Sequence, residues 1–396
     1  MNTETKIFLK KKFKGYYSRH RIPAPPEVDR REFGVGTLSD KIKIRHKSFK
    51  TERDLGNFLR REAPYYISYS TAYYEFPQNQ PMETKNWLGA ELIFDLDIKM
   101  DLLNSSKLVR VRDETLNLVD FLVTDFGIPK KDIQVNFSGS KGYHIHVLNE
   151  EVKKLGGEER REIVDYVSGD IDFMDYLEPD RDVNTGEEII TGPKKGDAGW
   201  YGRIYAGLHN FIRDSPIEDL MEVKGIGKKK AESIYRNKKK ILDELERGRY
   251  NYIPQIITID LHSSQRPDPN VKEYDMIKNV SSPLVQKIID EKAVKTLAAE
   301  DTDKMVTIDT SRLIRLPETI HGGSGLIAKK VKNLEEFDPL TEAVAFGEEK
   351  IRIDLKDKVS RFEIGGARFG PLHGTVEVPE FVGMYLLLKG LGDILQ

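Results

Sequence analysis

The segment ELIFDLDIKM, from Glu91 to Met100, decides the fold of this chain. Its apolar residues indicate a buried β-strand, which Asp95 and Asp97 interrupt two positions apart. Side chains alternate faces along a strand, so both carboxylates are expected on one face of the sheet. Adjacent carboxylates repel each other unless a cation lies between them, and Mg2+ or Mn2+ prefers such oxygen ligands. On this pattern alone, a strand end with two solvated aspartates is the alternative.

The composition is that of a soluble globular protein. The 396 residues are 32% charged and 38% hydrophobic, with a net charge of -2, which suits one large domain or a few smaller units. The chain has no cysteine, which excludes disulfides, Cys-ligated zinc, iron–sulfur clusters and thiol catalysis. No apolar run reaches the ~18 residues of a membrane span, and Lys10–Lys12 is not followed by the apolar stretch of a signal peptide. We therefore expect a cytoplasmic protein.

Hydrophobic periodicity predicts both helices and strands along the chain. Helices are predicted at 1–20, 51–62, 113–126, 281–300 and 379–395. Strands are predicted at 41–50, 64–76, 133–137, 144–147 and 254–261. Residues 150–250 are mostly polar and helical, which makes them a candidate helical insertion.

A loop that can bind phosphate follows the strand predicted at 133–137. Its sequence, SGSKGYHIHV at 138–147, joins two strands through serine, glycine and lysine residues. Glycines let the backbone approach an anion, hydroxyl and amide groups donate hydrogen bonds, and Lys141 adds positive charge. His144 and His146 alternate with apolar residues and are expected on one face of the strand. An ordinary glycine-containing hairpin is the alternative at this point.

Two arginine-containing segments are further candidates for phosphate binding. Residues 311–326, SRLIRLPETIHGGSGL, combine Arg315 and His321 with a glycine-rich turn. Arginine suits a triphosphate because its planar fork bonds two oxygens. Arg30 and Arg31 form a short basic turn that is either solvated or binds phosphate.

Two other regions suit nucleic acid without requiring it. The tyrosine-rich segment 65–76 can stack bases, although such a cluster more often packs within a sheet. The segment VKGIGKKKA at 223–231 resembles the hairpin of a helix-hairpin-helix unit, whose backbone amides bind a phosphate. A solvated basic helix pair explains the second segment equally well.

Together these features fit metal-assisted nucleotidyl transfer, in which two ions hold the attacking 3′-hydroxyl and the leaving pyrophosphate. Two ions usually need a third carboxylate beside Asp95 and Asp97. The candidates in this sequence are Asp260, Asp303 and Asp309.

The chain resembles the catalytic (small) subunit of archaeo-eukaryotic DNA primases, and the archaeal type most closely. Three ordered motifs carry the resemblance: FDLD at 94–97, SGSKGYH at 138–144, and RLIRLP at 312–317 followed by His321. Shorter similar segments are RREF at 30–33, PYY at 64–66, Met82 with Lys85, and Trp87. The resemblance covers about 1–150 and 255–390.

The resemblance implies an α/β (α+β) prim fold with a mixed central sheet and RRM-like elements. The catalytic domain would comprise 1–150 and 251–396, with the helical insertion at 151–250. The implied activity is DNA-dependent synthesis of short RNA or DNA primers on single-stranded templates for replication. Asp95, Asp97 and Asp303 would hold two Mg2+ or Mn2+ ions, with Asp309 as the fallback for Asp303.

The resemblance also implies ligands and partners. The nucleotide-binding residues would be Ser138, Ser140, Lys141, His144, Arg315 and His321. Expected partners are a large primase subunit in a heterodimer, the template, nucleoside triphosphates and the replication machinery in the nucleoid, with no membrane. Relatives commonly carry a zinc knuckle after the D-x-D strand, but this chain lacks cysteine, so no structural zinc is predicted. A repair-type primase-polymerase and a non-catalytic nucleic-acid-binding protein are the alternatives.

Overall fold

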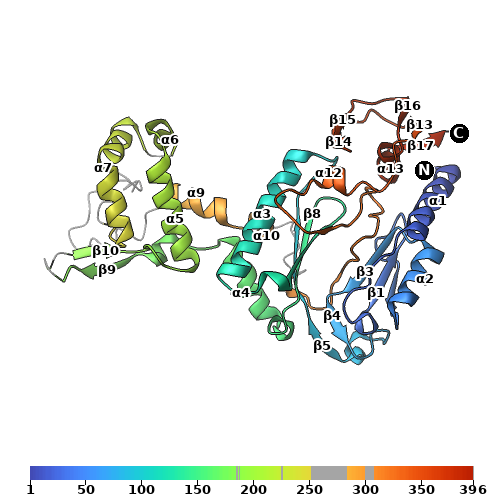
Figure 1. Cartoon of the computed structure of the whole chain (residues 1–396), viewed down its shortest axis with the longest axis horizontal. Coiled ribbons are helices and arrows are strands. Elements are labelled where there is room, and N and C mark those ends of the chain that lie inside the picture. Colours follow the sequence, from blue (N-terminus) through green and yellow to red (C-terminus); the bar gives the residue numbers. More distant parts are fainter. Residues whose placement is uncertain (184–185, 187, 224–225, 251–282, 299–306, 396) are drawn as a thin grey trace, which may run out of the picture. The chain divides into compact units, whose positions relative to one another are not determined.

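The computed structural model describes residues 1–183, 186, 188–223, 226–250, 283–298 and 307–395 (Figure 1). Two compact units make up this part of the chain. The first comprises Met1–Val119, Ile128–Val164 and Thr296–Gln396. The second comprises Asp120–Gly127 and Asp165–Lys295.

The first unit is built on two four-stranded sheets, which confirms the α/β class. One sheet has the order β11-β3-β1-β2, with strands Leu313–Arg315, Tyr66–Ser70, Phe33–Gly36 and Ile44–Lys47. The other has the order β12-β7-β8-β6, with strands Lys330–Val331, Ile133–Phe137, Gly142–Val147 and Leu92–Asp97. The strand predicted at 41–50 is therefore shorter than expected, and it lies at a sheet edge.

The described strand pairs are antiparallel, so the expected mixed sheet is not found in this part of the chain. β6 and β7 run in the same direction, but β8 lies between them and pairs with both. The helix α3, Ser105–Thr124, makes the connection from β6 to β7. A short hairpin then returns the chain as β8, and this order leaves no parallel neighbours.

Helices flank these sheets (Figure 1). α1 covers Thr3–Arg19 and α2 covers Glu52–Glu62, close to the predicted ranges. The Thr51 side chain accepts a hydrogen bond from Asp54 N and caps α2. Apart from short 3-10 helices, the remaining elements described up to residue 168 are β4 (Ala72–Tyr74), β5 (Trp87–Ala90) and α4 (Gly157–Ser168), whose last residues belong to the second unit.

The C-terminal region departs from prediction. A helix was expected at 379–395, but α13 covers only Glu380–Leu388 and β17 follows at Gly392–Leu395. Gly390 has a φ of 73°, the left-handed conformation that commonly ends a helix. The other elements are α10 (Lys295–Ala298), α12 (Pro339–Glu342), β13 (Lys350–Leu355), β14 (Phe362–Ile364), β15 (Ala367–Phe369) and β16 (Thr375–Pro379).

The second unit is mainly helical. Its helices are α5 (Gly199–Asp214), α6 (Ile217–Glu222), α7 (Lys228–Glu246) and α9 (Pro283–Lys292), and its hairpin is β9 (Glu178–Arg181) with β10 (Glu188–Thr191). Arg203 on α5 forms ion pairs of 2.6 Å with Asp120 and 2.8 Å with Asp125 within this unit. The strand predicted at 254–261, with Asp260, lies outside the described residues. Among the helices described in either unit, none is long and apolar enough to cross a membrane.

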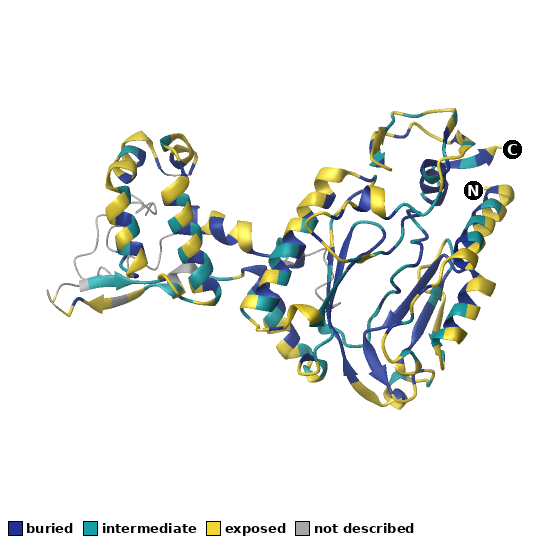
Figure 2. Cartoon of the chain, viewed as in Figure 1, coloured by how far each residue is buried: buried dark blue, intermediate teal, exposed yellow. Residues whose placement is uncertain are grey.

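A buried ion pair connects the two sheets of the first unit. Arg31 precedes β1, Glu91 precedes β6, and both side chains are fully buried. Arg31 also donates to the carbonyls of Ser70 and Thr71 at 2.8 and 2.9 Å, and His146 Nδ1 lies 2.8 Å from Glu91 Oε2. Both readings of Arg31, solvated turn and phosphate ligand, are therefore wrong, because its donors bind the protein itself. Figure 2 shows the strands around this pair as largely buried.

Candidate active site

The two aspartates lie on one face of β6, as their spacing predicts. The register with β8 places Asp95 opposite His144 and Asp97 opposite Gly142. A Cβ atom at Gly142 would lie 1.7 Å from the Leu96 carbonyl oxygen and 2.8 Å from Asp97 Oδ1. Only glycine fits at this position, and its lack of a side chain leaves the space beside the Asp97 carboxylate open.

The charges around Asp97 favour a cation. Burial raises the pKa of Asp97 to about 6, and the negative charge of Asp95 adds to the rise, while the positive charge of Lys141 opposes it. His144 Nε2 lies 3.4 Å from Asp95 Oδ1. Burial lowers the pKa of His144 to about 3, so this ring is neutral at pH 7 and does not neutralise the carboxylates. The pair therefore has the oxygen donors and the excess negative charge that suit a divalent ion.

The third carboxylate is not placed beside this pair. Asp303 lies outside the described residues. Asp309 is described, and its Oδ1 accepts hydrogen bonds from Ser311 N at 2.8 Å and Ser311 Oγ at 2.7 Å. Arg312 Nε lies 3.5 Å from Asp309 Oδ2. Within the described ranges, no three His, Asp or Glu side chains come together as a metal site.

The loop after β7 packs against the segment that carries His321. Ser138 Oγ accepts hydrogen bonds from Lys141 N at 3.3 Å and Gly142 N at 3.2 Å, so this hydroxyl shapes the loop. Gly139 has a φ of 82°, and a Cβ there would lie 2.9 Å from His321 Cβ. Ser140 and Lys141 are partly exposed at the tip of the loop. The loop therefore brings Lys141 and His321 to the same region as Asp97.

Arg315 comes to this site from the other sheet. It ends β11, where it lies opposite Ser68 of β3. Burial lowers the pKa of Arg315, whereas the nearby Tyr66, Tyr17, Asp97 and Asp95 raise it. Burial and then the positive charge of Arg315 hold the pKa of His321 well below its usual value. The two carboxylates, Arg315 and His321 are thus close enough to act on one another.

Sequence reasoning missed three residues near this site. Lys41 lowers the pKa of both Asp97 and His321, although it was assigned only to an edge strand. Gly142 was read as one loop glycine among others. Tyr66 lies against Arg315, whereas its segment predicts only base stacking or sheet packing. The basic pattern at 41–50 was the only signal for Lys41, and it did not indicate which basic residue faces the aspartates.

The motifs gathered here match a known family. The family model for the DNA primase small subunit matches residues 94–332. The chain is 34% identical over 425 residues to the DNA primase small subunit PriS of Methanothrix thermoacetophila, with 100% of each chain covered. It is 35% identical over 427 residues to PriS of Methanosarcina acetivorans (99% of this chain, 97% of the relative). Its identity to PriS of Halobacterium salinarum is 32% over 419 residues, with 99% of each chain covered.

The chain belongs to the DNA primase small-subunit family. As a member of the archaeal type, it is a primase catalytic subunit with a role in DNA replication and an enzyme of the nucleotidyltransferase type. The family suggests use of a divalent metal, and the term small subunit implies a large partner subunit. The matched range contains the aspartate pair, the 138–147 loop, Arg315 and His321.

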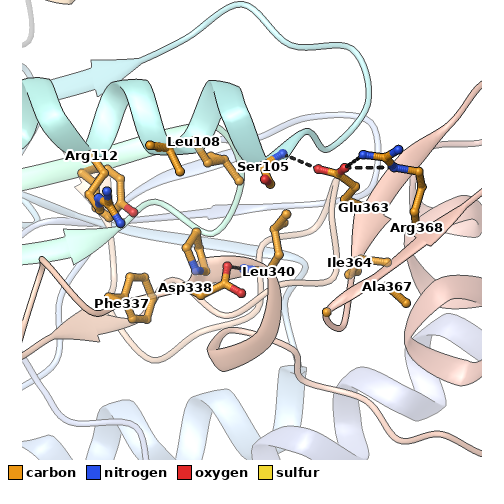
Figure 3. Close-up of a pocket in the computed structure, with 14 residues that line it drawn as sticks. Ser105, Leu108, Arg112, Phe337, Asp338, Leu340, Glu363, Ile364, Ala367 and Arg368 are labelled. Carbon is orange, nitrogen blue, oxygen red and sulfur yellow. Dashed lines mark hydrogen bonds and ion pairs between the residues drawn. The ribbon is translucent and has the colours of Figure 1, made fainter.

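A separate cavity of this primase subunit, about 470 Å³ in volume, does not contain these residues (Figure 3). It lies between α3 on one side and α12 with the β14–β15 hairpin on the other. Tyr143 of β8 lines it, and Tyr143 points to the sheet face opposite its neighbour His144. The cavity therefore lies on the face of this sheet opposite to the one that carries Asp95 and Asp97.

Proposed function

We propose that this protein synthesises short RNA or DNA primers on single-stranded DNA by two-metal nucleotidyl transfer. The observation that carries the proposal is the pair of carboxylates on one face of β6, Asp95 opposite His144 and Asp97 opposite Gly142, with the charge of Arg315 nearby. The two carboxylates repel each other unless a metal lies between them, and the guanidinium of Arg315 suits a polyanion. A metal-bound triphosphate supplies both.

We assign the acidic residues of the site to metal binding and the basic residues to the triphosphate. Asp95 and Asp97, with Asp303 as third ligand, would hold two Mg2+ or Mn2+ ions. Such ions, when bound, stabilise the charge that develops on the reacting phosphate and favour the 3′-hydroxyl as nucleophile. Arg315 and Lys141 would neutralise the triphosphate.

Hydrogen bonds would complete nucleotide binding. His144 and His321 have lowered pKa values and are neutral, so they would donate one hydrogen bond each without adding charge. Ser138 and Ser140 would donate through their hydroxyl groups. Because Ser138 Oγ already accepts two backbone hydrogen bonds, its proton is available to point outward.

Unprimed synthesis on a single-stranded template tests the proposal. Labelled ribonucleotides and deoxynucleotides would be supplied separately, with and without Mg2+ or Mn2+. We expect metal-dependent products without any primer. Products only from an existing primer would indicate a repair-type polymerase, and template binding without incorporation would indicate a non-catalytic binding protein.

Replacing Arg315 with alanine is expected to weaken nucleotide binding. Hydrogen bonds to charged groups contribute about 1.5 to 3 kcal/mol, so KM for the nucleotide should rise about 10- to 100-fold. The measurement is the initial rate of extension against nucleotide concentration. Arg352→Ala, at an exposed arginine on β13, is the control. An unchanged KM in Arg315→Ala would contradict the assignment of this residue.

We further propose that the groove in Figure 3 binds the large subunit. Leu108, Phe337 and Ile364 form an apolar floor, and Val109, which lines the groove next to Leu108, is 42% exposed. Arg112 lies at one end, and the ion pair of Glu363 and Arg368 lies at the other. An apolar centre with a polar rim is the usual anatomy of a protein interface.

Replacing Val109 with aspartate should weaken association with the large subunit. A charge in the apolar centre is left without a partner, so we expect Kd to rise at least ~30-fold, as for a hot-spot residue. Titration calorimetry with the large subunit measures this. Val183→Asp is the matched control, because Val183 is 98% exposed and lies in the second unit. Equal affinity of both variants would refute the groove as the interface.

A further inference from the structure

We infer that Tyr66 is a positioning residue, which holds Arg315 and His321 in place for the triphosphate of the incoming nucleotide. The inference rests on the proposed nucleotide site and adds to it a residue that does not itself touch the substrate. Tyr66 is only 6% exposed, so its ring acts through the side chains packed on it.

The sheet register creates this contact. Arg315 is directly opposite Ser68, and Tyr66 is two residues from Ser68 on the same strand. Residues two apart share a strand face, so Tyr66 is the diagonal neighbour of Arg315. Diagonal neighbours across an antiparallel pair are within reach of aromatic and long side chains.

The Tyr66 ring contacts both candidate phosphate ligands. Arg315 Cζ lies 4.9 Å from the ring centroid, in the range of a cation–π interaction. The His321 ring is 5.4 Å away at 84°, an edge-to-face arrangement. The Tyr66 ring therefore packs against both Arg315, at the end of β11, and His321, in the turn that follows, and it sets the distance between them.

The glycines after His321 make room for this ring. A Cβ at Gly322 would lie 2.7 Å from Tyr66 Cε2, and a Cβ at Gly323 would lie 3.0 Å from the Tyr66 hydroxyl oxygen. The first contact is too close for any larger residue without a shift of the ring. The glycine-rich turn thus has a second role besides backbone approach to phosphate, because it lets Tyr66 reach Arg315.

The Arg315 guanidinium has an N–H group that donates no hydrogen bond within the described part of the chain. Arg315 Nη1 is buried and makes no hydrogen bond to any described residue. A cation–π contact uses no N–H group of the guanidinium as a conventional hydrogen-bond donor, so these groups stay available. A triphosphate oxygen would therefore meet a donor already oriented, so less side-chain freedom is lost on binding.

The test compares five variants by KM and kcat for nucleotide addition to a primed template. Tyr66→Phe keeps the ring and should retain the wild-type KM. Tyr66→Leu removes the π face and should raise KM about 10-fold with little change in kcat, in line with cation–π contributions. Tyr65→Leu is the matched control, since Tyr65 packs on Phe13 at 4.7 Å instead. Tyr66→Leu combined with Arg315→Ala should show no rise beyond that of Arg315→Ala alone.

A fluorinated phenylalanine at position 66 covers the case in which Tyr66→Leu does not fold. Pentafluorophenylalanine keeps the ring but removes its negative face, so KM should rise relative to Tyr66→Phe. An unchanged KM in the fluorinated variant or in folded Tyr66→Leu, while Arg315→Ala raises KM, overturns the positioning role alone. If Arg315→Ala also leaves KM unchanged, the proposed nucleotide site itself fails.

Discussion

Primer synthesis is expected to fall at least ~1000-fold when Asp97 is replaced with asparagine, because metal ions supply several kcal/mol of transition-state stabilisation. Asparagine keeps the size of the side chain but removes the charge that holds a cation. Asp97 is exposed at the end of β6, and desolvation and the neighbouring Asp95 raise its pKa to about 6, so removal of its charge is not expected to destabilise the fold at pH 7. The variant should therefore lose activity while its unfolding temperature stays the same or rises.

Two measurements separate the loss of metal from the loss of structure. Binding of Mn2+, followed by titration calorimetry, should weaken in Asp97→Asn, and thermal unfolding should show an intact protein. Asp357→Asn serves as the control, because Asp357 is exposed on the surface. Full primer synthesis by Asp97→Asn would remove the carboxylate pair from the mechanism. A large drop in unfolding temperature would show that Asp97 is structural instead.

The parts of this site that follow from local periodicity could be predicted from the sequence. A strand has a period of two, so the shared face of Asp95 and Asp97 required only their spacing. The loop after β7 could be recognised by composition, because its glycines and serines have specific conformational uses. The motif order then identified the family, and the family model agrees with it.

The parts that depend on pairing between distant strands could not be predicted. Arg315 on β11 is next to β3, and the chain between them carries no pattern that sets this pairing. The contact of Tyr66 with Arg315 and the buried position of Arg31 both follow from such pairing. Arginine is rarely buried without a partner, and its partner Glu91 lies outside any local window of sequence.

Removing the Glu91 carboxylate is expected to destabilise the first unit by about 3 to 5 kcal/mol, the usual cost of leaving a buried charge unpaired. In Glu91→Ala, the guanidinium of Arg31 would be buried with only carbonyl partners, and His146 would lose its 2.8 Å contact. Urea unfolding followed by circular dichroism measures the change. Glu52→Ala is the matched control: its pair with Arg21, at 2.9 Å, has side chains 42% and 84% exposed. Its removal should cost no more than ~1 kcal/mol.

At acidic pH, the difference in unfolding free energy between Glu91→Ala and the wild type should become smaller. Burial alone would raise the pKa of Glu91, but the charge of Arg31 and the hydrogen bond from His146 outweigh it and lower this pKa to about 2. A carboxyl group whose pKa is lower in the folded state contributes stability above its unfolded pKa, here about 4.5. That contribution disappears as pH falls from about 4.5 to about 2, so the two unfolding free energies should converge in this range. A difference that is equally large at pH 7 and near pH 2 would mean that packing, and not the ion pair, connects the two sheets.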